Sequence, residues 1–195
     1  MPYIDTLPKK SEIFDYWKAR LHKHGILIDW GEPDCWACGF HYGSKYDIRT
    51  SDAGMEKIFR CWDKVPLQRC HIIPKSLGGT DGVANLFLMC RECHDAAPNT
   101  PFQDIFLEWA KNQSHLLRED EKIKSAMRSF GLDATTDLAK IEGIIHTEQF
   151  KSWLGDKVGL HRPQSKYAPT SSRLTPSTIV GLAVRYMRVI HEMQP

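Results

Sequence analysis

Two pairs of cysteines are the residues whose type and spacing most clearly predict chemistry in this sequence. Cys35 and Cys38 form one Cys-x2-Cys pair, and Cys90 and Cys93 form a second. Four thiolates complete the tetrahedral coordination of zinc and leave no position open for a substrate, so the pattern predicts a structural zinc. Such a site does not exist in the unfolded chain, and the free energy of zinc binding would therefore add to that of folding.

Other uses of the cysteines fit the sequence less well. A Cys-x-x-Cys pair can be a redox motif, but that motif follows a strand and precedes a helix, whereas the first pair lies in a glycine-rich stretch that includes Gly39 and Gly43. The start of the chain lacks the charged and apolar regions of a signal peptide, so we expect a cytoplasmic protein without disulfides. Cys61 and Cys70 lie outside the pairs. We expect them to be buried and inert, with a second metal site as the alternative.

Two histidines and an asparagine are candidates for catalysis. His71 lies in a short predicted strand over residues 67–73, Asn85 follows a glycine-rich turn, and His94 comes directly after the second cysteine pair. Imidazole suits a general base because its ordinary pKa lies near neutrality. Taken singly, each residue is ordinary, since such histidines are usually exposed or hydrogen-bonded and asparagine is common in turns. Their combination with a zinc site favours a catalytic interpretation.

The four segments of this central stretch together resemble a known family. They are Cys-His-Ile-Ile-Pro at 70–74, Gly-Gly-Thr-Asp at 78–81, Asn-Leu at 85–86 and Cys-Arg-Glu-Cys-His at 90–94. The set is similar to the HNH endonucleases, in the subgroup whose ββα-metal active site is braced by a four-cysteine zinc. The resemblance covers roughly residues 35–98. It implies an α+β fold, in which a mainly helical chain surrounds a small zinc-stapled ββα-metal core.

The resemblance also implies a role for each matching residue. His71 would be the general base that takes a proton from water, and Asn85 would hold the base or the two-stranded element, or touch the metal. His94 would bind a catalytic Mg²⁺, or another divalent ion such as Mn²⁺ or Ni²⁺, that stabilises the scissile phosphate. The expected function is hydrolysis of DNA, double-stranded in the leading hypothesis, in a setting such as restriction or phage defence. The alternative is a zinc-stapled nucleic-acid-binding module without catalysis.

Cys70 departs from the family pattern. Many members have Asp or a second His directly before the base, as a metal ligand, and a thiolate is a poor ligand for magnesium. Three explanations remain open at this point. Cys70 is only a packed neighbour and the ion is held by His94, phosphate and water; or a carboxylate such as Asp81 or Asp95 helps; or a softer ion is preferred.

The chain of 195 residues has a formal net charge of only +2, which is too small to attract nucleic acid to the molecule as a whole. We therefore expect any contact with nucleic acid to come from local basic patches. Arg69, Lys75 and Arg91 bracket the motif and are candidates for phosphate contacts, with solvated surface charge as an equal alternative. From residue 156 onward, six basic against two acidic residues give +4. This basic tail could bind DNA, mediate oligomerisation and so a homodimer, or be a solvated face. No apolar run is long enough to cross a membrane.

The periodicity of apolar residues predicts three parts. Residues 1–30 contain an N-terminal helix that packs on the core, residues 31–113 form the nuclease core with its zinc site, and residues 114–195 form a helical extension with the basic tail. Ser11 is the expected N-cap of the first helix, which Gly25 ends. Helices are also expected over 114–130, over 135–154 and from Thr175-Pro176 to about Met193, with a linker over 155–175.

A further helix is predicted to begin at Thr100-Pro101. Its apolar residues are expected to lie on one face and cover the zinc module; they are Phe102, Ile105, Phe106 and Trp109.

Overall fold

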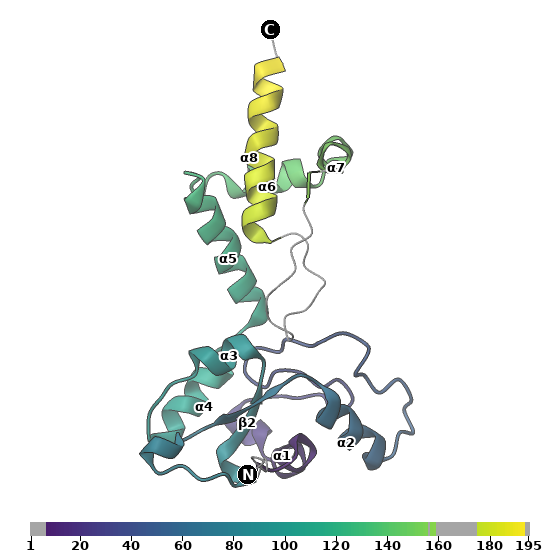
Figure 1. Cartoon of the computed structure of the whole chain (residues 1–195), viewed down its shortest axis with the longest axis vertical. Coiled ribbons are helices and arrows are strands. Elements are labelled where there is room, and N and C mark those ends of the chain that lie inside the picture. Colours follow the sequence, from purple (N-terminus) through teal and green to yellow (C-terminus); the bar gives the residue numbers. More distant parts are fainter. Residues whose placement is uncertain (1–6, 156, 159–174, 194–195) are drawn as a thin grey trace, which may run out of the picture. The chain divides into compact units, whose positions relative to one another are not determined.

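The computed structural model describes residues 7–155, 157–158 and 175–193. The chain divides into two compact units, Met1–His115 and Leu116–Pro195. Each unit has its own hydrophobic core, and Figure 1 labels most of the helices and the strand β2. The described residues form eight α-helices and one two-stranded antiparallel sheet, so the predicted α+β fold class is confirmed. No helix in this part of the chain is long and apolar enough to cross a membrane.

The first unit carries the sheet and the shorter helical elements. In chain order these elements are α1 (Lys10–Trp17), η1 (Leu21–His24), α2 (Met55–Lys64), β1 (Gln68–His71), η2 (Lys75–Leu77), η3 (Val83–Asn85), β2 (Leu86–Met89), α3 (Arg91–Ala96) and α4 (Gln103–Lys111). The order β1, β2, α3 is the strand–strand–helix arrangement that the sequence predicted.

The sheet pairs β1 with β2 so that Cys70 lies opposite Phe87 and His71 opposite Leu86. Pairing continues past β1, since the Ile72 N–H donates to the Asn85 carbonyl at 2.8 Å. An isolated hairpin of this length is at best marginally stable in water. Here α1 and α3 contact β2, and all four β2 side chains are completely buried, so packing rather than hairpin propensity stabilises the sheet.

The N-terminal helix contacts the sheet, and Ser11 is not its cap, contrary to the prediction. Lys9 precedes the helix and its N–H donates to the Glu12 carboxylate at 2.6 Å. The Ser11 hydroxyl instead donates to Asp63 at 3.0 Å and joins α1 to α2. The Trp17 indole N–H donates to the Leu86 carbonyl at 2.8 Å, so α1 also fixes the start of β2.

The core of the first unit is an aromatic cluster that joins distant segments. Phe14 of α1 stacks on Trp62 of α2, with ring centroids 4.4 Å apart and an interplanar angle of 15°. Phe87 of β2 makes edge-to-face contacts with Trp36 at 5.1 Å and with Phe106 of α4 at 5.4 Å. Each such pair contributes roughly 0.5–1.5 kcal/mol beyond the burial of its area. These contacts connect the helices to the strand that precedes the second cysteine pair.

Helix α4 covers this core with a different face from the predicted one. It begins at Gln103 and buries Phe106, while Trp109 packs against the core with part of its surface exposed. Phe102 and Ile105 are 59% and 47% exposed, so their assignment to the buried face was wrong. Phe102 precedes the helix, and the buried stripe runs instead through Phe106, Leu107 and Ala110.

The second unit is helical in its described part. Its elements are α5 (His115–Ser129), α6 (Leu138–Ile145), α7 (Glu148–Leu154) and α8 (Pro176–Met193). The single helix predicted over 135–154 is two helices, because the Thr147 hydroxyl accepts from the Phe150 N–H at 3.2 Å and starts α7. Most of the predicted linker, with Arg162, Lys166 and Arg173 of the basic tail, lies outside the described residues, while Arg185 and Arg188 are exposed on α8.

Candidate active site and zinc centre

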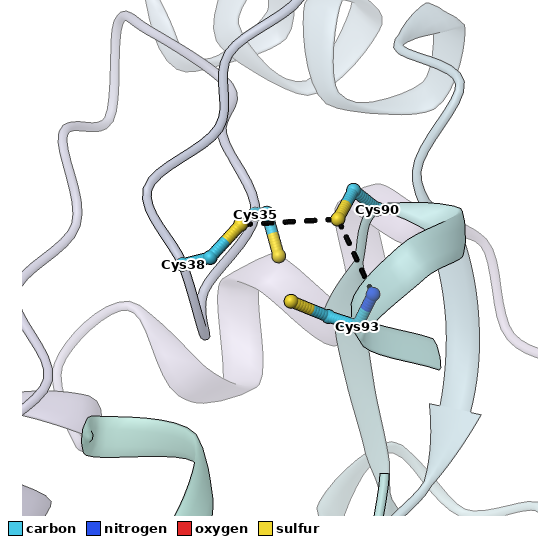
Figure 2. A group of neighbouring side chains, drawn as sticks. All are labelled: Cys35, Cys38, Cys90 and Cys93. Carbon is cyan, nitrogen blue, oxygen red and sulfur yellow. Dashed lines mark hydrogen bonds between the residues drawn. The ribbon is translucent and has the colours of Figure 1, made fainter. Parts of the chain in front are cut away.

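The four cysteines of the two pairs converge on one point. All four sulfurs lie within 4.8 Å of one another, and the side chains are buried (Figure 2). Tetrahedral zinc with bonds of about 2.3 Å places its sulfur ligands about 3.8 Å apart. The distance between the Cys38 and Cys90 sulfurs is 3.8 Å, and no disulfide forms among the six cysteines, so the cluster fits a zinc site.

Local backbone geometry positions the cysteines in both halves of this cluster. In the first half, the Gly39 N–H donates to the Cys35 carbonyl at 2.8 Å and Gly39 has a φ of +70°, a left-handed conformation that favours glycine. In the second half, Cys90 is the N-cap of α3, and its sulfur accepts from the Cys93 N–H at 3.5 Å. Hydrogen bonds from Cys35, Cys38 and Cys93 hold the pKa of the Cys90 thiol far below its usual range, which favours the thiolate that zinc requires.

Backbone hydrogen bonds connect the segment of the first cysteine pair to the sheet and to His115, the last residue of the first unit. The Trp36 N–H donates to the Leu88 carbonyl of β2 at 3.1 Å. The His115 N–H donates to the Cys38 carbonyl at 2.9 Å, and the His115 ring packs edge-to-face on Phe40 at 4.8 Å. The knuckle of residues 35–38 is therefore attached to the hairpin by backbone contacts as well as by the sulfur cluster.

His71, at the end of β1, contacts a carboxylate from the loop between the strands. Its Nε2 lies 2.8 Å from Oδ1 of Asp81, and Oδ2 of Asp81 lies 2.6 Å from the Lys75 ammonium. The side chains of His71 and Asp81 are 22% and 29% exposed, so water can reach both. Hydrogen bonds from Lys75 and His71 hold the pKa of Asp81 below its usual range.

Asn85 braces the same loop. Its side-chain oxygen accepts from the Ile73 N–H, and its amide donates to the carbonyls of Ile73 and Thr80, all three at 2.9 Å. Gly79 lies beside these bonds, and a Cβ added there would be 1.7 Å from the Ile73 carbonyl oxygen. The sequence indicated only turn chemistry for Gly79. The need for glycine arises from this close approach of two backbone segments.

His94, on α3, lies beside Asp95 and not in the four-cysteine cluster. Its Nδ1 is 3.5 Å from Oδ1 of Asp95, and the two side chains are 37% and 61% exposed. The two acidic candidates thus contact different histidines, Asp81 with His71 and Asp95 with His94. Within the described residues, the four cysteines are the one group of three or more potential ligands close enough to share an ion.

Cys70 is a buried packing residue. Its side chain is 5% exposed within the main core, and burial raises the pKa of its thiol to about 11. Successive residues of a strand point to opposite faces, so Cys70 and the half-exposed His71 face different environments. A buried thiol is a poor ligand for magnesium, which prefers oxygen ligands. The burial of Cys70 agrees with its description as a packed neighbour.

The three candidate phosphate-binding residues lie near the motif and are engaged within the protein. Lys75 pairs with Asp81, and Arg91 lies 3.5 Å from Asp95 through its Nε. The side chains of Lys75 and Arg91 are 60% and 59% exposed, while Arg69 is half-buried in β1. Surface pairs of this kind are weak and can be exchanged for phosphate contacts.

Comparison with known proteins agrees with this geometry. The family model described as HNH endonuclease matches residues 59–100. A search of curated proteins and a search of solved structures found no match to the chain. The matched segment runs from within α2 to just before α4, and so contains β1, the loop with Asp81, β2 and the second cysteine pair. This segment, folded as strand, strand and helix beside a four-cysteine cluster, is thus similar in sequence to the HNH endonuclease family.

Proposed function

We propose that the chain is a metal-dependent endonuclease that hydrolyses phosphodiester bonds in double-stranded DNA. The observation that supports this most directly is the position of His71. It lies at the end of β1, partly exposed to water and fixed by Asp81, on a hairpin held by Asn85. An imidazole in such a position is held in place and still reaches water, so it can act as a general base.

In the proposed reaction, His71 is the base and His94 holds the divalent ion. His71 takes a proton from a water molecule, the hydroxide attacks the phosphorus, and the bond to the 3′ oxygen breaks. A divalent ion held at His94, with Asp95, water and phosphate oxygens, would neutralise charge on the phosphate. Magnesium commonly keeps several waters and takes only one or two carboxylates, so a site with few protein ligands fits its chemistry.

The experiment is a plasmid nicking assay with Mg²⁺, Mn²⁺ or Ni²⁺. We expect the wild type to cut DNA with at least one ion, and His71→Ala to lose roughly 10²- to 10⁴-fold in rate while its zinc content and unfolding midpoint stay unchanged. His22→Ala, at an exposed histidine in η1, is the matched control and should cut as the wild type does.

The alternative is a DNA-binding module that has lost cleavage. The absence of an acidic residue at the Cys70 position is the observation in its favour. A wild type that cuts neither DNA nor RNA with any of the three ions, and binds DNA as tightly as His71→Ala does, would establish this alternative and exclude the nuclease.

A further inference from the structure

The loop between the two strands places the carboxylate of Asp81 against His71, the last residue of β1. Asp81 lies ten residues after His71, yet its Oδ1 is 2.8 Å from Nε2 of the ring. The second oxygen, Oδ2, is 2.6 Å from the Lys75 ammonium, which lies on the same loop. Both oxygens of Asp81 therefore have a partner within the protein, one of them a cation.

The position of Asp81 is set by backbone contacts. Asn85 donates to the carbonyl of Thr80, the residue directly before Asp81, at 2.9 Å. The same amide side chain holds the N–H and carbonyl of Ile73, two residues after His71. One side chain thus ties together the segments that carry the two members of the pair. Gly79 permits the close approach that this requires.

The contact fixes which ring nitrogen can act as a base. A carboxyl group is ionised at neutral pH, and the contacts with Lys75 and His71 hold the pKa of Asp81 below its usual range. A carboxylate only accepts hydrogen bonds, so the proton of the contact must be on Nε2. The neutral ring then has its lone pair on Nδ1. Among the described residues, none hydrogen-bonds to Nδ1.

The same contacts disfavour Asp81 as a ligand of the catalytic ion. A divalent cation on Oδ2 would lie close to the Lys75 ammonium and be repelled by it. A cation on Oδ1 would displace the bond to His71. The contacts of Asp95 with His94 and Arg91 are longer, both at 3.5 Å, so a cation on Asp95 would displace weaker interactions than a cation on Asp81.

We propose that Asp81 is a positioning residue that holds His71 through Nε2 and leaves Nδ1 to take the proton from the attacking water. In this step the water O–H bond breaks, its proton forms a bond with Nδ1, and the resulting hydroxide forms the new bond to phosphorus. The bond from phosphorus to the 3′ oxygen breaks, and that oxygen leaves with the electron pair and takes a proton from solvent water. The Nε2–H proton stays on the ring, and the imidazolium is stabilised by the Asp81 carboxylate. The inference rests on the proposed function, since it assigns His71 the role of base.

The test compares Asp81→Asn with the wild type in the full chain. An amide can donate to Nε2, so the substitution permits the opposite tautomer of the ring while keeping shape and size. We expect ¹⁵N NMR to show Nε2–H in the wild type and a mixture, or Nδ1–H, in the variant. We expect kcat for plasmid cleavage to fall by about 10²-fold or more and KM to change by less than about threefold.

Asp95→Asn is the matched control, because it removes the carboxylate beside the other histidine. It should leave the tautomer of His71 unchanged. Affinity for Mn²⁺ or Ni²⁺, measured by calorimetry, should be the same for Asp81→Asn and the wild type. Circular dichroism and zinc content establish that each variant is folded.

Two results would overturn the inference while leaving the nuclease in place. One is an active wild type whose Asp81→Asn variant keeps both the tautomer and kcat. The other is a loss of Mn²⁺ or Ni²⁺ affinity in Asp81→Asn, which would make Asp81 an ion ligand. A wild type that cuts no DNA overturns the proposed function itself, and the role of Asp81 with it.

Discussion

At the scale of single residues, Gly79 shows how closely the loop over the candidate base is packed. A Cβ there would lie 1.7 Å from the Ile73 carbonyl oxygen and 2.8 Å from the Asn85 amide nitrogen. The first neighbour is backbone and cannot move without disturbing the end of the hairpin. Any side chain at this position must therefore open the loop that holds Asp81 and Asn85.

We expect Gly79→Ala to lower the free energy of unfolding by about 2–4 kcal/mol and to reduce cleavage in proportion to the disturbance of the loop. Denaturant unfolding followed by tryptophan fluorescence measures the stability. Gly82→Ala is the matched control in the same loop, because its nearest neighbour is a side-chain oxygen at 3.4 Å and its φ of −67° suits alanine. Equal losses for the two variants would contradict the steric explanation.

Cys70 yields a second prediction, since its thiol is buried and neutral. Cys70→Ala should cut DNA at close to the wild-type rate with the same ion preference, and should lose ~1 kcal/mol of stability through the small void it creates. Nicking rates with Mg²⁺ and Mn²⁺ measure the effect. A loss of activity comparable with that of His71→Ala would show instead that the thiol takes part in the site.

The sequence was sufficient to find Cys35, Cys38, Cys90 and Cys93, because the spacing of zinc ligands is local within each pair and the two pairs have the same form. The contact between His71 and Asp81 could not be predicted in the same way. It depends on how Asn85 and Gly79 fold the intervening loop, and a ten-residue separation does not determine that geometry. The sequence therefore offered Asp81 only as one possible metal ligand in place of the residue missing at position 70, whereas the structure pairs it with His71, the candidate base.

At the scale of elements, the four-cysteine cluster joins the knuckle of residues 35–38 to the start of α3. Cys93→Ser should abolish tight zinc binding and make the first unit unfold or aggregate, because zinc binding free energy is part of its folding free energy. Metal analysis by mass spectrometry and thermal unfolding measure the two effects. Cys61→Ser is the control, since Cys61 is half-buried on α2 and lies outside the cluster. A zinc-free Cys93→Ser protein as stable as Cys61→Ser would contradict the structural role.

Some elements were predictable and others were not. The hairpin, α3 and the terminal helix follow from apolar runs, turn residues and a proline at the start of α8. Helix α2 was not predicted, although Met55, Ile58, Phe59 and Trp62 have helical spacing. The break between α6 and α7 depends on one hydroxyl cap at Thr147, which apolar periodicity does not reveal.

At the scale of the whole molecule, the two hydrophobic cores share no residue. We expect thermal unfolding in two transitions, and a chelator should lower the Tm of only one of them, because all four candidate zinc ligands lie in the first unit. Calorimetry with and without EDTA measures this. Five of the six tryptophans also lie in the first unit, so fluorescence should follow the chelator-sensitive transition. A single transition that EDTA shifts as a whole would contradict this division.

The hydrogen bond from the Trp36 N–H to the Leu88 carbonyl has a consequence for solubility. β2 pairs with β1 on one edge, and the knuckle of residues 35–38 bonds to the Leu88 carbonyl of a strand whose sequence is Leu-Phe-Leu-Met. An uncovered apolar edge strand is a template for pairing with another chain. Loss of zinc would therefore expose an aggregation-prone strand as well as weaken the fold. Bound zinc would in this way reduce self-association of the protein during synthesis and storage.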